Sequence, residues 1–108
     1  MFTGSTLEGS KPEQYAQLLE QARGLMHGET DRTANAANLS ALIFHALPNI
    51  NWAGFYLMRG DELVLGPFQG NVACVRIAFG RGVCGCVAQH RRTILGPDVD
   101  PLAGPLAC

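Results

Sequence analysis

The stretch that most decides the fold is residues 71–86, NVACVRIAFGRGVCGC, which holds three of the four cysteines of this 108-residue chain. Residues 72–77 alternate in character and predict a half-buried strand. Gly80-Arg81-Gly82 then breaks the strand, and a short helix is expected over 83–90. Cys84 would lie at the start of that helix, where backbone N–H groups and the helix dipole favour a thiolate. Inert, buried cysteines are the competing interpretation, because free cysteine is among the most buried residue types.

The composition is that of an ordinary globular protein, 47% hydrophobic and 16% charged, with a net charge of −1. Near-neutral charge gives no support for nucleic acid or an anionic membrane as a partner. Residues 1–13 have neither the basic nor the apolar region of a signal peptide, and no apolar run approaches the ~18 residues of a membrane span. We therefore expect a cytoplasmic protein with reduced thiols, forming a single domain over 1–108 with residues 1–9 disordered.

Two helices are predicted in the first half of the chain. Ser10 and Glu13 have the spacing of a capping box, and apolar residues over 15–26 recur with helical periodicity. A second helix is expected after Thr30-Asp31, either of which can cap it, and it should end before Pro48.

Strands are predicted in the second half. Residues 51–58 (NWAGFYLM) are rich in aromatic side chains and predict a strand, which a turn at 59–61 joins to an antiparallel strand at 62–65. Residues 66–70, bounded by glycines, are expected to form a loop, and 92–95 a brief strand. Helices followed by antiparallel strands indicate an α+β fold, with the helices packed on one sheet.

The four cysteines allow three hypotheses. A zinc site is disfavoured because one residue between Cys84 and Cys86 is tighter than the usual zinc knuckle. A cluster of buried structural cysteines is the second. The third is a dithiol mechanism, in which one thiolate attacks an oxidised substrate and another thiol resolves the product.

A series of motifs, in order along the chain, favours the third hypothesis. They are NWAGFY at 51–56, LGPFQG at 65–70, ACVRI at 73–77, FGRGVCG at 79–85, DV at 98–99 and AC at 107–108. Through these motifs the chain resembles the free methionine-(R)-sulfoxide reductases, small enzymes with a GAF-type fold, over essentially all of its length from Tyr15. The resemblance implies a central antiparallel sheet with the N-terminal helices on one face and the ligand pocket on the other.

The resemblance also implies roles for particular residues. Cys108 matches the attacking cysteine, Cys74 the cysteine that forms a disulfide with it, and Cys84 a third thiol that assists or substitutes in resolution. Trp52 and Tyr56 match the aromatic residues around the substrate's sulfoxide and methyl group. The expected reaction leaves methionine and a sulfenic acid, which condenses to a disulfide that thioredoxin reduces. The resemblance implies no metal and no cofactor.

Other interpretations remain open at this point. Trp52 and Tyr56 are also explained by ordinary packing on a sheet face, and Cys86, where the family has no thiol, either forms a competing disulfide or packs as a small hydrophobe. The family continues beyond the cysteine matched by Cys108, with acidic residues that hold the substrate's amino group. The isolated chain is therefore expected to be unstable or inactive unless another chain supplies the rest.

The predicted function is reduction of free L-methionine-(R)-sulfoxide, with thioredoxin as reductant and a homodimer as one expected assembly. The alternative function is a non-catalytic GAF-type module that binds a small molecule or senses oxidants, or an inactive fragment of the reductase.

Overall fold

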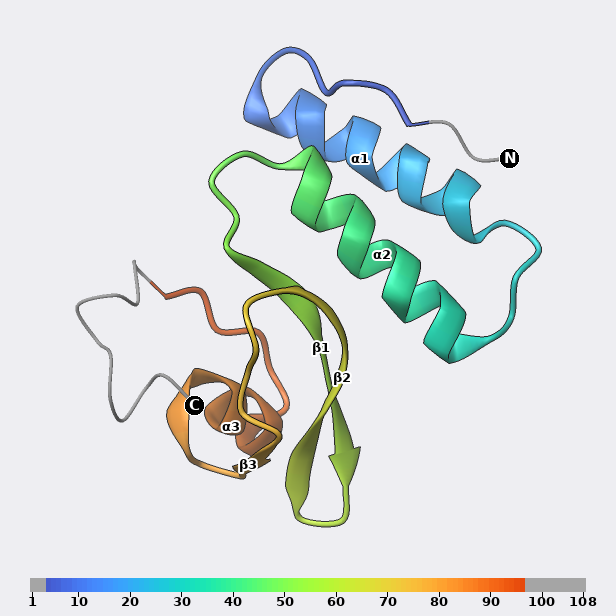
Figure 1. Cartoon of the computed structure of the whole chain (residues 1–108). Helices are drawn as coiled ribbons and strands as arrows, with labels where there is room; N and C mark the ends of the chain where they lie inside the picture. The colour runs from blue at the N-terminus through green and yellow to red at the C-terminus, as the bar shows by residue number, and fades with distance from the viewer. Residues whose placement is uncertain (1–3, 97–108) are drawn as a thin grey trace. The chain divides into compact units, whose positions relative to one another are not determined.

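The structure is a computed structural model that describes residues 4–96, and it has the predicted α+β content (Figure 1). The strands form one sheet in the order β1-β2-β3. The elements in chain order are α1 (Lys11–Met26), α2 (Arg32–Ala46), β1 (Trp52–Arg59), β2 (Glu62–Gly70), β3 (Arg76–Ala78) and α3 (Gly82–His90).

The described residues divide into two compact units. The first takes residues up to 55 together with 67–71, and the second takes 56–66 together with the residues from 72 onward. The hairpin of β1 and β2 therefore contributes to both units. The expectations of a single domain and of disorder over residues 1–9 stay predictions, and residues 4–8 have no regular secondary structure.

Helix α1 begins with the capping box expected from the sequence. The Ser10 hydroxyl accepts a hydrogen bond from the Glu13 N–H at 3.4 Å, and the Glu13 carboxylate accepts one from the Ser10 N–H at 3.1 Å. These bonds from Ser10 also lower the pKa of the Glu13 carboxyl. The helix ends at Met26, with His27 as its C-cap, as predicted.

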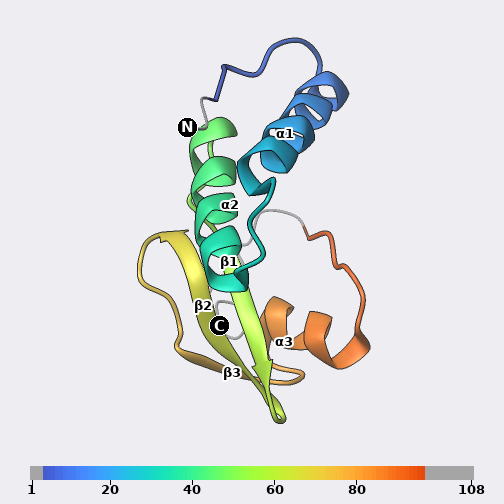
Figure 2. The same ribbon diagram turned by 90° about the vertical axis from the view of Figure 1, so that its right-hand side faces the viewer.

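Helix α2 is capped by Asp31, whose carboxylate accepts from the Ala34 N–H at 2.8 Å. It runs antiparallel to α1, and the two helices lie side by side in both views (Figures 1 and 2). Ser40 is the most buried residue of α2, with 1% of its surface exposed. Its hydroxyl donates to the Ala36 carbonyl at 2.8 Å and lies 3.3 Å from the Pro67 carbonyl of β2, which ties the helix to the first unit's part of the sheet.

Strand β2 is longer than expected, and the predicted loop at 66–70 is wrong. Strand β3 pairs only with residues 62–64 of β2, so Pro67 lies beyond that pairing, where a missing N–H is tolerated. Gly54 of β1 permits a close approach, because a Cβ built at Gly54 would lie 2.3 Å from the Cβ of Phe68. The glycine and proline that suggested a loop are thus accommodated within a strand.

Strand β3 is shorter than expected, and the strand predicted over 72–77 is wrong for its first four residues. Val72 and Val75 are 94% and 63% exposed, so the alternating apolar residues there bury little surface. Ile77, at 5% exposure, is paired with the equally buried Leu63 of β2. Only the part of the stretch that contributes to this small core forms regular strand.

The glycine turn and the following helix match the prediction. Gly80 and Gly82 adopt positive φ values of 83° and 62°, a region that glycine enters without steric cost. Helix α3 packs on β3. It ends at His90, and the next residue, Arg91, is its C-cap and adopts a left-handed conformation. The strand expected over 92–95 is wrong, because residues 92–96 form no strand.

Candidate active site

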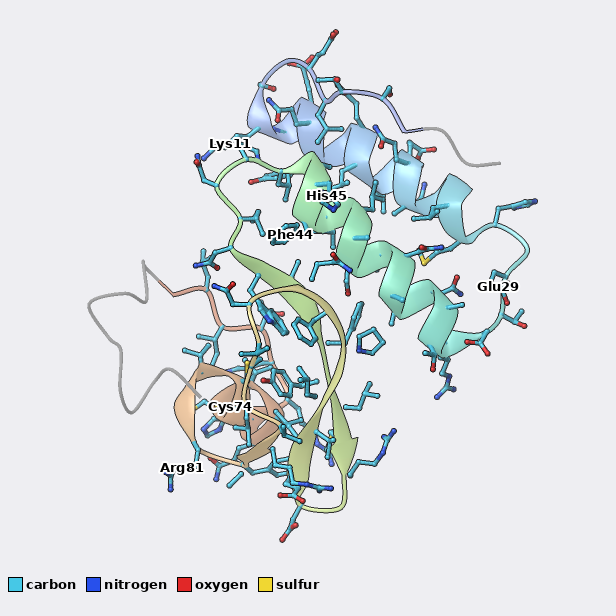
Figure 3. The ribbon with its side chains drawn as sticks, in the orientation of Figure 1. Lys11, Glu29, Phe44, His45, Cys74 and Arg81 are labelled. Atoms are coloured by element: carbon cyan, nitrogen blue, oxygen red, sulfur yellow. The ribbon has the colours of Figure 1, made fainter. Side chains whose placement is uncertain are left out.

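The second unit brings together Tyr56 and Cys74. Tyr56 is held by β1, and Cys74 lies in the irregular segment 71–75 that precedes β3. The Tyr56 hydroxyl donates a hydrogen bond to the backbone carbonyl of Cys74 at 2.7 Å. Figure 3 labels Cys74 beside the short β3–α3 region. A residue expected to contact substrate thus also contacts the backbone of a predicted redox cysteine.

The cysteines differ in their covalent state. Cys74 is disulfide-bonded, whereas Cys84 and Cys86 are free thiols. Cys108, the predicted attacking residue, lies outside the described residues.

Cys84 lies in the first turn of α3, as the sequence predicts. The residue is exposed as a whole, yet partial burial of its thiol raises its pKa above the usual value. Desolvation of the sulfur therefore opposes the thiolate that the helix N-terminus is expected to favour at this position. Burial likewise raises the pKa of the Tyr56 hydroxyl, and the charge of a Cys84 thiolate raises it further. Ionisation of the Cys84 thiol therefore disfavours ionisation of the Tyr56 hydroxyl.

Cys86 contacts the Gly80-Arg81-Gly82 turn. Its Sγ donates a weak hydrogen bond to the Gly80 carbonyl at 3.8 Å, and the residue is half-buried. Residues two apart on a helix do not face one another, so Cys84 and Cys86 are poorly placed for a disulfide within α3. Cys86 is a free, half-buried thiol in this structure, and whether it takes part in the redox chemistry stays a prediction.

Trp52 belongs to the first unit. Its ring stacks on Phe68 with the centroids 5.5 Å apart and the planes 16° from parallel. Gly70 lets the chain pass close to this ring, because a Cβ at Gly70 would lie 3.1 Å from Trp52 Cδ1. The contribution of Phe68 was missed because the glycines around it indicated a loop. The usable signal was the spacing of Phe68, two residues from both Gly66 and Gly70, which places the three on one face of an extended β2.

An open cleft of about 800 Å³ lies in the first unit, between the N-terminal segment, α1 and α2. Of the predicted site residues that the structure describes, none lines this cleft. Its walls mix apolar and amide side chains with a histidine that Figure 3 labels, and they include Gln14, Gln21, Asn38, Leu42 and His45.

No group of three or more His, Cys, Asp or Glu side chains within residues 4–96 is placed to hold a metal ion. No helix within this range is both long and apolar enough to cross a membrane.

Comparison with known proteins identifies the class and then the family. No protein-family model matches the chain. A solved structure described as a GAF sensor protein from Burkholderia vietnamiensis matches 93% of this chain and 62% of its own, with 57% identity and a TM-score of 0.83. The fold is therefore that of a GAF domain.

Two further relatives identify the family within the class of GAF-domain proteins. Free methionine-R-sulfoxide reductase from Neisseria meningitidis, solved with its substrate, matches all of this chain and 64% of its own, with 41% identity and a TM-score of 0.88. Free methionine-R-sulfoxide reductase from Escherichia coli is 50% identical over 99 residues, which is 92% of this chain and 60% of that protein. The chain belongs to the family of free methionine-R-sulfoxide reductases. It spans between 59% and 68% of the length of the curated relatives it matches.

Proposed function

We propose that this chain reduces free L-methionine-(R)-sulfoxide to L-methionine, with Cys108 as the attacking thiol and Cys74 as the resolving thiol. The observation that carries the proposal is the state of the cysteines: Cys74 is disulfide-bonded while Cys84 and Cys86 are free. Family membership supports the same substrate, because relatives bear the reductase name and one was solved with its substrate bound.

The reaction balances with two thiols and an external dithiol. The Cys108 thiolate attacks the sulfoxide sulfur and forms an S–S bond while the sulfoxide oxygen takes up a proton. The oxygen then passes to the Cys108 sulfur as this S–S bond and the original S–O bond break, so that methionine leaves and Cys108 becomes a sulfenic acid. The Cys74 thiol then attacks the sulfenic sulfur, forms the S–S bond and releases water. Thioredoxin, a dithiol, returns two electrons by thiol–disulfide exchange and is itself oxidised.

The remaining residues have supporting roles in this proposal. Trp52 and Tyr56 provide aromatic surface for the sulfoxide and its methyl group, to which aromatic faces and edges are suited. Cys84 assists as a secondary thiol. Burial raises its pKa, so this thiol is mostly protonated near neutral pH. The cytoplasm stays the expected compartment, and the homodimer also stays a prediction, testable by sedimentation equilibrium.

A coupled assay tests the activity. The purified chain, thioredoxin, thioredoxin reductase and NADPH are supplied with the R or the S epimer of free methionine sulfoxide. The same assay is run on a chimera continued by the residues that follow the matched region in the E. coli relative, since the chain spans 60% of that protein. We expect little turnover from the isolated chain, and NADPH consumption and methionine with the R epimer only from the chimera, with none when the chimera carries Cys108→Ser. Absence of methionine from both folded proteins would contradict the proposal.

A redox-sensing module is the second candidate, favoured by the likeness to a protein described as a GAF sensor. A sensor would oxidise and recover its thiols with peroxide and dithiothreitol but would release no methionine from the sulfoxide. Methionine measured by chromatography therefore separates the two functions.

A further inference from the structure

The segment 71–75, which carries Cys74, has no regular secondary structure, and Ala73 and Cys74 are its half-buried residues. Val72 and Val75, on either side of the cysteine, are 94% and 63% exposed. Among the described residues, the Leu65 N–H donates to the Val75 carbonyl of this segment at 2.9 Å, and the Tyr56 hydroxyl donates to the Cys74 carbonyl at 2.7 Å. The second bond acts directly on the residue that bears the thiol.

This bond matters most when the disulfide is open. In the oxidised protein, the disulfide itself restrains Cys74. Once the disulfide is reduced that restraint is gone, and an exposed irregular segment gains conformational freedom. The resolving thiol must nevertheless meet the sulfenic sulfur in an attack geometry, and small displacements of a reacting group cost large factors in rate.

We propose that Tyr56 is a positioning residue for Cys74: its hydroxyl holds the Cys74 backbone so that the thiol of the reduced protein stands ready to attack the sulfenic acid. The assignment rests on the proposed function and adds to the contact with substrate predicted for the Tyr56 ring. The step it serves forms the Cys74–Cys108 bond, breaks the S–O bond of the sulfenic acid and releases water.

Two features suit Tyr56 to this task. Its Oη–O distance of 2.7 Å is the usual length of a good O–H···O hydrogen bond. Desolvation, followed by the nearby Cys84 charge, raises the pKa of the hydroxyl above its ordinary value near 10. The group therefore stays protonated, and remains a donor, throughout the pH range in which thiols react.

Tyr56→Phe tests the inference, because it keeps the ring and removes the hydroxyl. Reduced protein is mixed with the R sulfoxide, and three quantities are followed: methionine in the first turnover, sulfenic acid trapped by a 1,3-dicarbonyl reagent, and the Cys74 disulfide by peptide mapping. We expect disulfide formation to be slowed about tenfold more than methionine formation, so that sulfenic acid accumulates between the two steps. Tyr15→Phe, a 54% exposed tyrosine on α1, is the matched control.

A second arm separates this inference from the proposed function. Hydrogen peroxide replaces the sulfoxide as the source of sulfenic acid, so disulfide formation is measured even if the chain makes no methionine. A non-natural 4-aminophenylalanine at position 56, whose amine also donates, should restore the rate if the hydrogen bond is what matters.

Disulfide formation at the wild-type rate in Tyr56→Phe, in either arm, would overturn the inference. It would equally be overturned if the variant raised KM and slowed methionine formation without accumulating sulfenic acid, because the hydroxyl would then act on substrate. Wild-type protein that forms the disulfide with peroxide but no methionine from the sulfoxide would remove the proposed function and leave the positioning role standing.

Discussion

At the scale of single residues, Cys84 shows two local effects in opposition. Its place in the first turn of α3 favours a thiolate, while burial of the sulfur favours the neutral thiol. The direction of its pKa shift, upward and caused by desolvation, indicates that burial is the stronger effect. A cysteine at a helix start is therefore not sufficient for a reactive thiol.

Alkylation measures this balance directly. We expect the rate of Cys84 alkylation by iodoacetamide to rise with pH with a midpoint above the ~8.5 of an unperturbed cysteine. The native state holds the proton more tightly than the unfolded state, so this group's contribution to stability is present at lower pH and is lost as pH rises through the raised pKa. Peptide mass spectrometry reports the rate, and concentrated urea should return the midpoint to the ordinary value. A native midpoint below 8 would show that the helix terminus dominates.

Gly85 is the second residue whose identity is dictated by close contact. Its carbonyl accepts from the Gly80 N–H at 2.9 Å, and a Cβ would lie 2.5 Å from the Ala78 carbonyl oxygen. We expect Gly85→Ala to lower the free energy of unfolding by about 1–3 kcal/mol through overpacking. Gly24→Ala is the control, since nothing lies within 4 Å of a Cβ there and alanine favours the helix by about 0.5–1 kcal/mol. Equal effects in urea denaturation would contradict this account.

At the scale of elements, the helices could be predicted because the residues that cap each helix lie within one turn of its end. Ser10, Glu13 and Asp31 each form the capping hydrogen bond that their spacing indicates. A cap depends on residues within one turn, so no knowledge of the sheet is needed.

The α1 cap gives a graded test. We expect Ser10→Ala to destabilise the protein by about 0.5–2 kcal/mol and Ser10→Gly by only a few tenths, because glycine leaves the N–H groups open to water. Urea denaturation followed by circular dichroism at constant pH gives both values. The two variants would be equally destabilised if the hydroxyl bond contributed nothing.

The strands could be predicted only in part, because their extent depends on partners distant in sequence. Residues 66–70 continue β2 through a proline that the pairing with β3 does not reach, while residues 72–75 leave the sheet despite their apolar alternation. Glycine, proline and alternation are local signals, whereas strand pairing is set by contacts across the sheet.

Contacts between residues distant in sequence also restricted how much of the candidate site could be predicted. Trp52, Tyr56, Cys74 and Cys84 were named from motifs, but the hydrogen bond from Tyr56 to the Cys74 carbonyl joins residues eighteen apart in the sequence and has no local signature. The raised Cys84 pKa likewise follows from burial that sequence spacing does not reveal. Sequence patterns named the candidate residues, whose roles stay predictions, and only the fold revealed the contact between Tyr56 and Cys74.

At the scale of the whole molecule, the proposed mechanism depends on which two cysteines form the disulfide. The chain has the GAF fold and belongs to the free methionine-R-sulfoxide reductase family. A disulfide at Cys74 beside two free thiols on α3 agrees with a reaction that passes from an attacking cysteine to Cys74.

Peptide mapping after a single turnover tests that central claim most directly. Fully reduced chain, or the chimera completed from the E. coli relative, is mixed with one equivalent of free L-methionine-(R)-sulfoxide, quenched by alkylation, digested and analysed by mass spectrometry. The account predicts one methionine released per protein, a peptide pair linked through Cys74 and Cys108, and alkylated Cys84 and Cys86. Methionine released with a Cys84–Cys86 or Cys74–Cys84 link, or no methionine from the folded protein, would contradict it.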